Sequence, residues 1–468
     1  MLGGAPRRIV RSIGSADLSS DGQRLAFIRF NDGQMELAVA APDGSDAHAV
    51  TRLAPNFKYY YPRWSPDGEW IGYLRSVYFD DVLFIVPARG GEPRQVVRDR
   101  GVLRGFAWTA DSRRLVYSSS RGTTILYLPS FNLWTADLSG GEPRQLTFGE
   151  SSYLHPDLGY NGAVLASRLQ MQFNIWKYPV EGAPAENVHR ALQITHQTGQ
   201  VQTPSVGPDD KEMVYLSDSG GHGNLWVMKL DSAETRQITF ERDPAKPVGV
   251  PVWSPDGKHI AFVIRSPLHF DVDLWLISPD GSGLRKVEDT GGWASWSGDG
   301  RWLYYGIYIN RESLADQLRK VSPGQPVDVR SEAASAQAVA PDGTAVYFVR
   351  YLMNVNDSPD LEICAARPEN GAAQVTARIP GVRVPDWLII HPVISPDGKW
   401  LALTLTDGGV TILWALSTTN GSMRQITDFG QRHTFICRRV SWSSDGKHIF
   451  AALGEGDADL ALLEGLAP

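Results

Sequence analysis

The residues best suited to do chemistry in this chain are tyrosines, arginines and one histidine that stand three or four positions before a recurring aromatic or apolar residue. They are Tyr60, Tyr61, Arg104, His391, Arg438 and Arg439. Tyrosine rings attract cations and stack on flat groups, and arginine forms charge-assisted hydrogen bonds with carboxylates. If a fold brings these side chains to one place, they could bind a protein, an acidic peptide or a sugar acid. The alternative is that they only fill or solvate the rim of a channel.

The sequence lacks the motifs of the common catalytic classes. The G-x-S-x-G nucleophile elbow of serine hydrolases does not occur, and the nearest phrases, "SDSGGHG" at 217–223 and "GGWASWSG" at 291–298, lack a required glycine. The HRD tripeptide of protein kinases is also missing, and the DFG at 428–430 stands without it. We therefore expect a protein that is not an enzyme and that uses no cofactor.

A metal site is the remaining route to catalysis. The ten histidines are scattered through the chain, and no H-E-x-x-H motif or close Cys/His group occurs. Because a repeat fold can bring distant residues together around an axis, a metal-dependent lyase acting on sugar acids stays open as an alternative. Replacing His391 by Ala and measuring bound metal would test it.

The composition is that of a globular protein without a basic surface. Of the 468 residues, 42% are hydrophobic and 21% charged, and the formal net charge is −7. Binding to phosphates requires positive charge, so we expect no nucleic-acid partner. No run of 18 apolar residues occurs, so we expect no membrane insertion by this chain. The two cysteines, Cys364 and Cys437, favour two unpaired core thiols over a single disulfide.

One phrase recurs along the chain and must position the residues named above. "WSPDGEWIGY", "WSPDGKHIAF" and "SPDGKWLAL" are three of its copies. Aligned on the Asp-Gly step, the chain contains ten such units, with the second position of the step at Gly22, Gly68, Ser112, Gly162, Asp210, Gly257, Gly300, Gly343, Gly398 and Gly446. A period of 43 to 55 residues made of strands alone predicts a β-propeller.

The sixth unit shows how one blade is encoded. Residues 250–254 form an apolar strand, and Pro255-Asp256-Gly257 form a turn, because Pro presets φ, Asp binds turn amides and Gly accepts a positive φ. Residues 259–265, 273–277 and 284–287 supply three further strands. The aromatic residues before the turn, such as Trp253, are expected to pack between neighbouring blades rather than to bind ligand.

The sequence therefore predicts an all-β propeller of about ten four-stranded blades, spanning residues 1–468. The last unit ends after its third strand, whereas "APRRIV" at 5–10 resembles a fourth strand, and pairing the two would close a single ring. The alternative is a seven-bladed ring of residues 149–468, with residues 1–148 as three blades of a truncated ring, since rings usually have four to eight blades.

The repeats resemble those of TolB-type (WD40-like) propellers over essentially the whole chain. The stretch at 421–466, "GSMRQITDFG…LLEGL", is similar to the end of propeller regions attached to bacterial serine/threonine kinases or winged-helix regulators. This resemblance implies a non-catalytic, monomeric binding module, the sensing part of a larger bacterial signalling protein, in a periplasmic or extracytoplasmic place. A stand-alone periplasmic scaffold like TolB is the other implication, although the N-terminus shows no apolar signal-peptide region.

Overall fold

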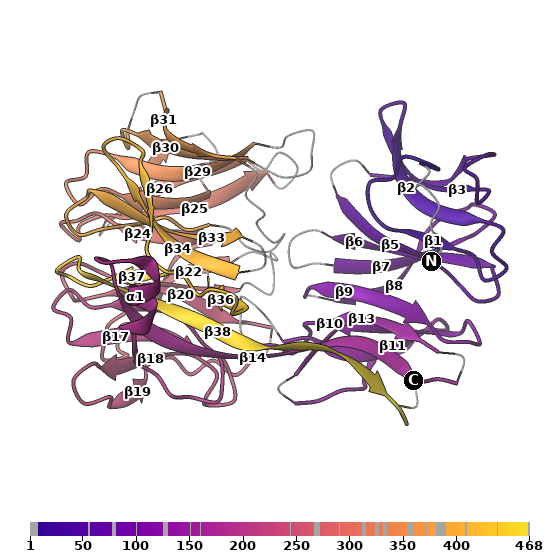
Figure 1. The fold of residues 1–468 in the computed structure, drawn as a ribbon, viewed down its shortest axis with the longest axis horizontal. Coiled ribbons are helices and arrows are strands. Elements are labelled where there is room, and N and C mark those ends of the chain that lie inside the picture. Colours follow the sequence, from indigo (N-terminus) through magenta and orange to yellow (C-terminus); the bar gives the residue numbers. More distant parts are fainter. Residues whose placement is uncertain are drawn as a thin grey trace. The chain divides into compact units, whose positions relative to one another are not determined.

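The fold is seen in a computed structural model that consists almost entirely of β-strands (Figure 1). The described residues are 8–54, 57–76, 81–99, 101–124, 130–149, 151–159, 161–243, 245–265, 272–289, 291–310, 315–322, 327–330, 335–352, 360–369, 372–380, 390–407, 410–437 and 439–466. In these ranges, α1 (Pro184–His189) is the single helix, and no helix is long and apolar enough to cross a membrane.

All ten predicted turns are present, each joining the first and second strands of a repeat. The residue at the second position of each Asp-Gly step has a positive φ, between 56° and 80°. Eight of the ten are Gly, and Ser112 and Asp210 adopt the same conformation at 57° and 56°. In the sixth repeat, the Ser254 hydroxyl donates to Asp256 Oδ1 (2.6 Å) and accepts from the backbone N–H of His259 (2.9 Å). The turn aspartates are thus structural acceptors, as the sequence predicted.

The chain divides into two compact units, each made of four-stranded blades. The first unit comprises Met1–Thr123, Pro129–Gln170 and Asp457–Pro468. Its first three sheets are antiparallel and follow the chain order: β1 (Ala16–Leu18), β2 (Leu25–Asn31), β3 (Gln34–Ala40), β4 (His48–Leu53); β5 (Lys58–Trp64), β6 (Trp70–Ser76), β7 (Asp81–Pro87), β8 (Arg94–Asp99); β9 (Leu103–Trp108), β10 (Arg114–Ser119), β11 (Asn132–Asp137), β12 (Arg144–Gln145).

The second unit comprises Thr124–Leu128 and Met171–Gly456 and contains five sheets in chain order. These sheets are β16 (Val201–Val206), β17 (Glu212–Ser217), β18 (Asn224–Lys229), β19 (Thr235–Gln237); β20 (Val248–Trp253), β21 (Ile260–Arg265), β22 (Val272–Ile277), β23 (Arg285–Glu288); β24 (Gly291–Trp296), β25 (Leu303–Asn310), β26 (Ala315–Val321), β27 (Val327–Arg330); β28 (Ser335–Val339), β29 (Val346–Leu352), β30 (Asp360–Ala366), β31 (Gln374–Ile379); β32 (Val393–Ile394), β33 (Trp400–Asp407), β34 (Val410–Ser417), β35 (Met423–Gln425).

The fourth and tenth repeats exchange strands through two 16-residue strands, β14 (Val164–Pro179) and β38 (His448–Leu463). In the first unit, β14 follows β13 (Ser152–Leu158) as second strand, and β38 supplies the third. In the second unit, β38 follows β36 (Thr434–Ile436) and β37 (Ser441–Trp442), while β14 supplies the third strand and β15 (Leu192–Gln193) the fourth. Each unit therefore contains residues of both β14 and β38.

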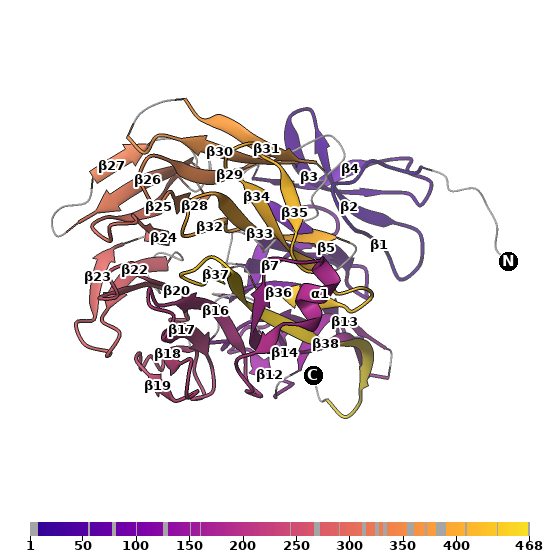
Figure 2. The same cartoon turned by 60° about the vertical axis from the view of Figure 1, so that its left-hand side comes forward.

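The second unit is a closed ring of six blades. Its innermost strands contact one another in the order β37, β16, β20, β24, β28, β32 and back to β37 (Figure 2). Two hydrogen bonds link β37 to its neighbours in the ring. The Ser441 hydroxyl accepts from the N–H of Val206 on β16 (3.0 Å), and the indole N–H of Trp442 donates to the carbonyl of Val393 on β32 (2.9 Å). The ring size differs from the ten or seven blades expected, and the compact units divide at residues 170 and 456 rather than 148. The physical reason is the β14–β38 exchange, which no local repeat pattern reveals.

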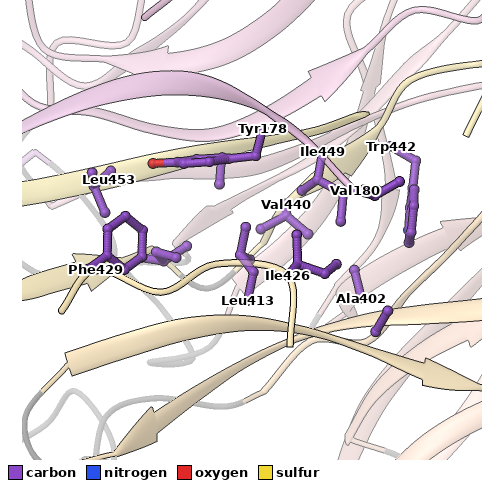
Figure 3. Close-up of a cluster of buried hydrophobic side chains, with 13 residues drawn as sticks. Tyr178, Val180, Ala402, Leu413, Ile426, Phe429, Val440, Trp442, Ile449 and Leu453 are labelled. Atoms are coloured by element: carbon purple, nitrogen blue, oxygen red, sulfur yellow. The ribbon is translucent and has the colours of Figure 1, made fainter. Parts of the chain in front are cut away.

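The ring closes over a hydrophobic cluster (Figure 3). Tyr178 of β14 and Phe429 meet edge to face, with ring centroids 6.1 Å apart. Leu413 of β34 and Ile449 of β38 are fully buried in the same cluster. Because apolar burial contributes roughly 25 cal/mol per Å², this cluster holds the first and last strands of the unit together.

The aromatic residues before the turns pack between blades, as expected. Trp64, Trp108 and Trp253 are buried. The indole N–H of Trp108 donates to the carbonyl of Arg63 in the preceding blade (3.2 Å), and that of Trp296 donates to Val252 in the same way (3.2 Å). The expectation that these positions serve packing is therefore confirmed at each of these residues.

The described part of the N-terminus lies against the first sheet. Val10 packs on Phe27 and Ala38, and the carbonyl of Ile9 lies beside Gly44. The β4 carbonyl of Val50 lies beside Gly90 of the next blade in the same manner. Ile9 thus occupies the place of an outer strand, although no pairing with β38 occurs among the described residues.

Candidate functional site in the channel of the six-bladed unit

A β-bulge interrupts the innermost strands at a constant position. Three residues before the aromatic position, φ is positive at Tyr61 (54°), Gly105 (86°), His155 (50°), Thr203 (47°) and Val250 (51°). The pairing with the second strand shifts register at each of these places. A bulge turns a side chain out of the regular alternation of a strand. This position is therefore where an innermost strand can aim a side chain toward the axis.

The structure divides the six residues predicted to line a channel mouth between the two units. Tyr60, Tyr61 and Arg104 belong to the first unit, and His391 and Arg439 to the second. Arg438 lies outside the described residues. The five described residues therefore belong to two units, and each unit is considered by itself.

In the second unit, Arg439 extends across the ring. It precedes β37, and its Nη1 donates to the carbonyl oxygen of Ala294 on β24 at 3.0 Å. Since β24 is three places from β37 in either direction around the ring, the side chain reaches from one innermost strand to the opposite one. Arg439 is 8% exposed. Burial lowers the pKa of Arg439 to about 10, so the guanidinium stays positively charged at neutral pH.

No carboxylate pairs with this buried charge among the residues that the structure describes, and the bond to Ala294 is the one hydrogen bond recorded there for its guanidinium. The contrast with other arginines of the unit is clear. Arg236 and Arg319 are more exposed, yet pair with Glu212 (2.7 Å) and Glu288 (3.0 Å). Buried charges in proteins are normally paired, because desolvation without a partner is costly.

Buried polar groups without partners occur on the neighbouring innermost strand. Gln202 and Thr203 of β16 are fully buried. Neither the Gln202 Oε1 nor the Thr203 hydroxyl has a hydrogen-bond partner within the described part of the chain. Thr203 stands at the same repeat position as Arg439 and His391, and His391 is also buried. Positive charge and hydroxyl donors at one level of a channel are suited to an anionic group.

The first unit contains a separate cluster on two innermost strands, β5 and β13. The rings of Tyr60 and Tyr61 lie 6.0 Å apart, and the ring of Tyr61 meets His155 edge to face at 5.7 Å. Burial, and then the charges of Arg104 and Arg63, lower the pKa of His155, so its imidazole is neutral at neutral pH. Tyr60 and Tyr61 also pack on the hydrophobic cluster beneath them. These tyrosines thus have a packing role whether or not they bind ligand.

Arg104 contacts residues of its own blade. Its Nη1 donates to the carbonyl of Leu103 (3.3 Å), and its guanidinium carbon lies 6.0 Å from the centre of the Phe131 ring. Gly105 explains how His155 comes so near, since a Cβ there would lie 3.0 Å from His155 Cα.

Sequence reasoning missed His155, Gln202 and Thr203. The signal existed, because His155 and Thr203 occupy the same repeat position as Tyr61 and Arg439. This repeat position was hard to recognise because the turns of the fourth and fifth repeats read "GYNG" and "GPDD" instead of the recurring Pro-Asp-Gly. In the described residues, no three His, Cys, Asp or Glu side chains gather in a way that could hold a metal ion.

No family model matches the chain. The chain is 26% identical over 272 residues to the uncharacterized protein Atu1656 of Agrobacterium fabrum, covering 53% of this chain and 84% of that protein. It is 32% identical over 87 residues to the Tol-Pal system protein TolB of Anaeromyxobacter dehalogenans, covering 19% of each. It is 23% identical over 302 residues to dipeptidyl-peptidase 5 of Porphyromonas endodontalis, covering 56% of this chain and 38% of that one. The chain therefore spans only a minor part of the TolB and peptidase relatives.

Two solved structures that align with parts of the chain are TolB proteins. TolB from Acinetobacter baumannii aligns with a TM-score of 0.40 at 12% identity, covering 86% of this chain and 82% of that one. A putative TolB from Agrobacterium tumefaciens aligns with a TM-score of 0.25 at 19% identity, covering 58% and 79%. The expectation of an all-β propeller is confirmed by the observed four-stranded sheets. The 87-residue match to TolB supports the TolB-like character of the repeats.

Proposed function

We propose that this chain is a ligand-binding β-propeller whose binding site is the central channel of the six-bladed unit. One observation carries the proposal: the buried, charged Arg439 reaches from one innermost strand of that unit to the opposite one without a carboxylate partner among the described residues. A charge that is desolvated without compensation costs folding free energy, so its presence is best explained by an anionic ligand.

The wider role that fits this site is capture of a protein, peptide or small acidic molecule. The relative TolB carries the name of the Tol-Pal system, which supports an interaction role for this kind of propeller. A sensing role in a larger extracytoplasmic protein is proposed from the sequence pattern of residues 421–466 alone, whose likeness to propellers attached to kinases or winged-helix regulators stays a prediction. In that role, ligand capture in the channel would be relayed to an attached domain.

Calorimetric titration of the full chain tests the proposal. The probes are a tetraglutamate peptide, trigalacturonate and, as the oppositely charged control, a tetralysine peptide. We expect at least one acidic probe to bind and tetralysine not to bind, because Arg439 attracts carboxylates and repels ammonium groups. Failure of both acidic probes to bind would contradict the proposal.

A peptidase activity is the other function to test, because two curated relatives carry peptidase names. The full chain is incubated with a fluorogenic dipeptide amide, and release of the fluorophore is followed. We expect no release above that of buffer. Turnover that persists through purification would assign this chain to the enzymes instead.

A further inference from the structure

We propose that Arg439 is the receptor for a single carboxylate, carried on a narrow, extended ligand that enters the channel of the six-bladed unit. This inference rests on the proposed function and names the chemical group that the site recognises. The hydroxyl of Thr203 is the second donor to that carboxylate.

The placement of Arg439 favours recognition over structural support. Among the described residues, its one hydrogen bond, to the Ala294 carbonyl, uses one of the five N–H groups of a guanidinium. A neutral amide could make the same bond at a lower desolvation cost, because a buried charge loses its hydration. The remaining donors of the planar fork match the two oxygens of a carboxylate.

The neighbouring groups define what the ligand carries. Thr203 is at the same repeat position as Arg439 on the adjacent blade, and its buried hydroxyl has no partner within the described residues. The guanidinium of Arg439 carries one positive charge and the hydroxyl of Thr203 carries none. Their sum matches the single negative charge of a carboxylate. Innermost strands bring residues from all six blades to the axis, so the group that carries the carboxylate has to be slender.

A peptide C-terminus and a uronic acid share this chemistry, and paired probes distinguish them. The first pair is acetyl-tetra-alanine with a free C-terminus and its C-terminal amide. The second pair is trigalacturonate and the neutral trigalactose. Dissociation constants are measured by calorimetry for the full chain, for Arg439→Gln and for Thr203→Val. Arg285→Gln is the matched control, since Arg285 is an exposed arginine of the same unit.

We expect one acid to bind at least tenfold more tightly than its neutral counterpart, and the pair in which this occurs identifies the source. Arg439→Gln should abolish that preference, Thr203→Val should weaken binding of the acid three- to tenfold, and Arg285→Gln should change neither. Equal binding of acid and neutral probes by the wild type would overturn the inference while leaving the proposed function standing. A preference that survives Arg439→Gln would also overturn it. Absence of binding by every probe would remove the proposed function itself.

A melting experiment without ligand separates recognition from a supporting role. If Arg439 is kept for binding, Arg439→Met removes an uncompensated buried charge, and the unfolding temperature should stay the same or rise. A fall of several degrees would mean that Arg439 holds opposite blades together, and would overturn the inference. Circular dichroism of each variant verifies that the sheets are intact.

Discussion

Gly454 and Phe173 offer a sharp test of the strand exchange, because they face each other across the β14–β38 pair within the six-bladed unit. A Cβ added at Gly454 would lie 2.5 and 2.6 Å from two carbons of the Phe173 ring and 2.9 Å from the methyl carbon of Met171. Such distances are about 1 Å shorter than a normal contact between carbon atoms, which is about 3.5 Å or more. Phe173 is 1% exposed, so its ring has little room to move.

The expected effect of Gly454→Ala therefore depends on what residue 173 is. In the wild type, overpacking should lower the free energy of unfolding by about 1–3 kcal/mol. Phe173→Ala alone should lower it by about 3–5 kcal/mol, because it leaves a cavity. In that background, Gly454→Ala should be neutral or stabilising by up to about 1 kcal/mol, since the methyl refills space and Ala is preferred to Gly in a strand.

Urea unfolding of the four proteins, followed by circular dichroism, measures these free energies. Gly14→Ala is the control, because nothing lies within 4 Å of a Cβ at that position; it should change stability by less than about 0.5 kcal/mol, as surface changes usually do. If Gly454→Ala has the same effect with Phe and with Ala at position 173, the two residues do not touch as the structure shows, and the exchanged pairing is refuted.

Three further predictions concern single residues. Ser441→Ala should lower the free energy of unfolding by about 1–3 kcal/mol, because it leaves the Val206 N–H buried without an acceptor at the ring closure; urea unfolding measures the loss, and an unchanged midpoint would argue against this contact. Gly105→Ala should cost about 1–3 kcal/mol, since φ is +86° and the new Cβ would lie 3.0 Å from the Cα of His155; a neutral effect on the melting temperature would contradict this close approach. Burial raises the pKa of Asp99 above 3.8. The folded state therefore binds this proton more tightly than the unfolded state, and the contribution of Asp99 to stability falls as pH rises from about 4 through the raised pKa. Because Asn does not titrate, the stability of Asp99→Asn relative to the wild type should increase with pH over that window; a difference that does not change with pH would refute the assignment.

The local parts of the fold could be predicted because they depend on neighbouring residues. A turn such as Pro255-Asp256-Gly257 follows from the conformational limits of Pro and Gly and from the hydroxyl of Ser254, all within five residues. The two cysteines are both buried, in different hydrophobic clusters, which agrees with the expected core thiols. The bulge three positions before the aromatic recurs with the repeat, as at Thr203 and Val250; that residues at this position face a ligand stays a prediction.

The candidate site could be predicted only in part. The repeat position selected Arg439 and His391, which belong to the six-bladed unit, and Tyr60, Tyr61 and Arg104, which belong to the other unit. That these side chains line a ligand site stays a prediction. No spacing reveals that Arg439 reaches Ala294, since 145 residues separate them and the contact depends on which blades face each other across the ring.

The sequence by itself determined the blade and its turn, because these follow from the conformational preferences and side-chain alternation of short segments. Only the tertiary structure decided how many blades share a ring and which side chains meet in its channel. The reason is that β14 and β38 pair over residues separated by more than 260 positions. A strand of alternating apolar residues can pair with many partners, and the choice is made by the packing of the whole sheet, as at Phe173 and Gly454.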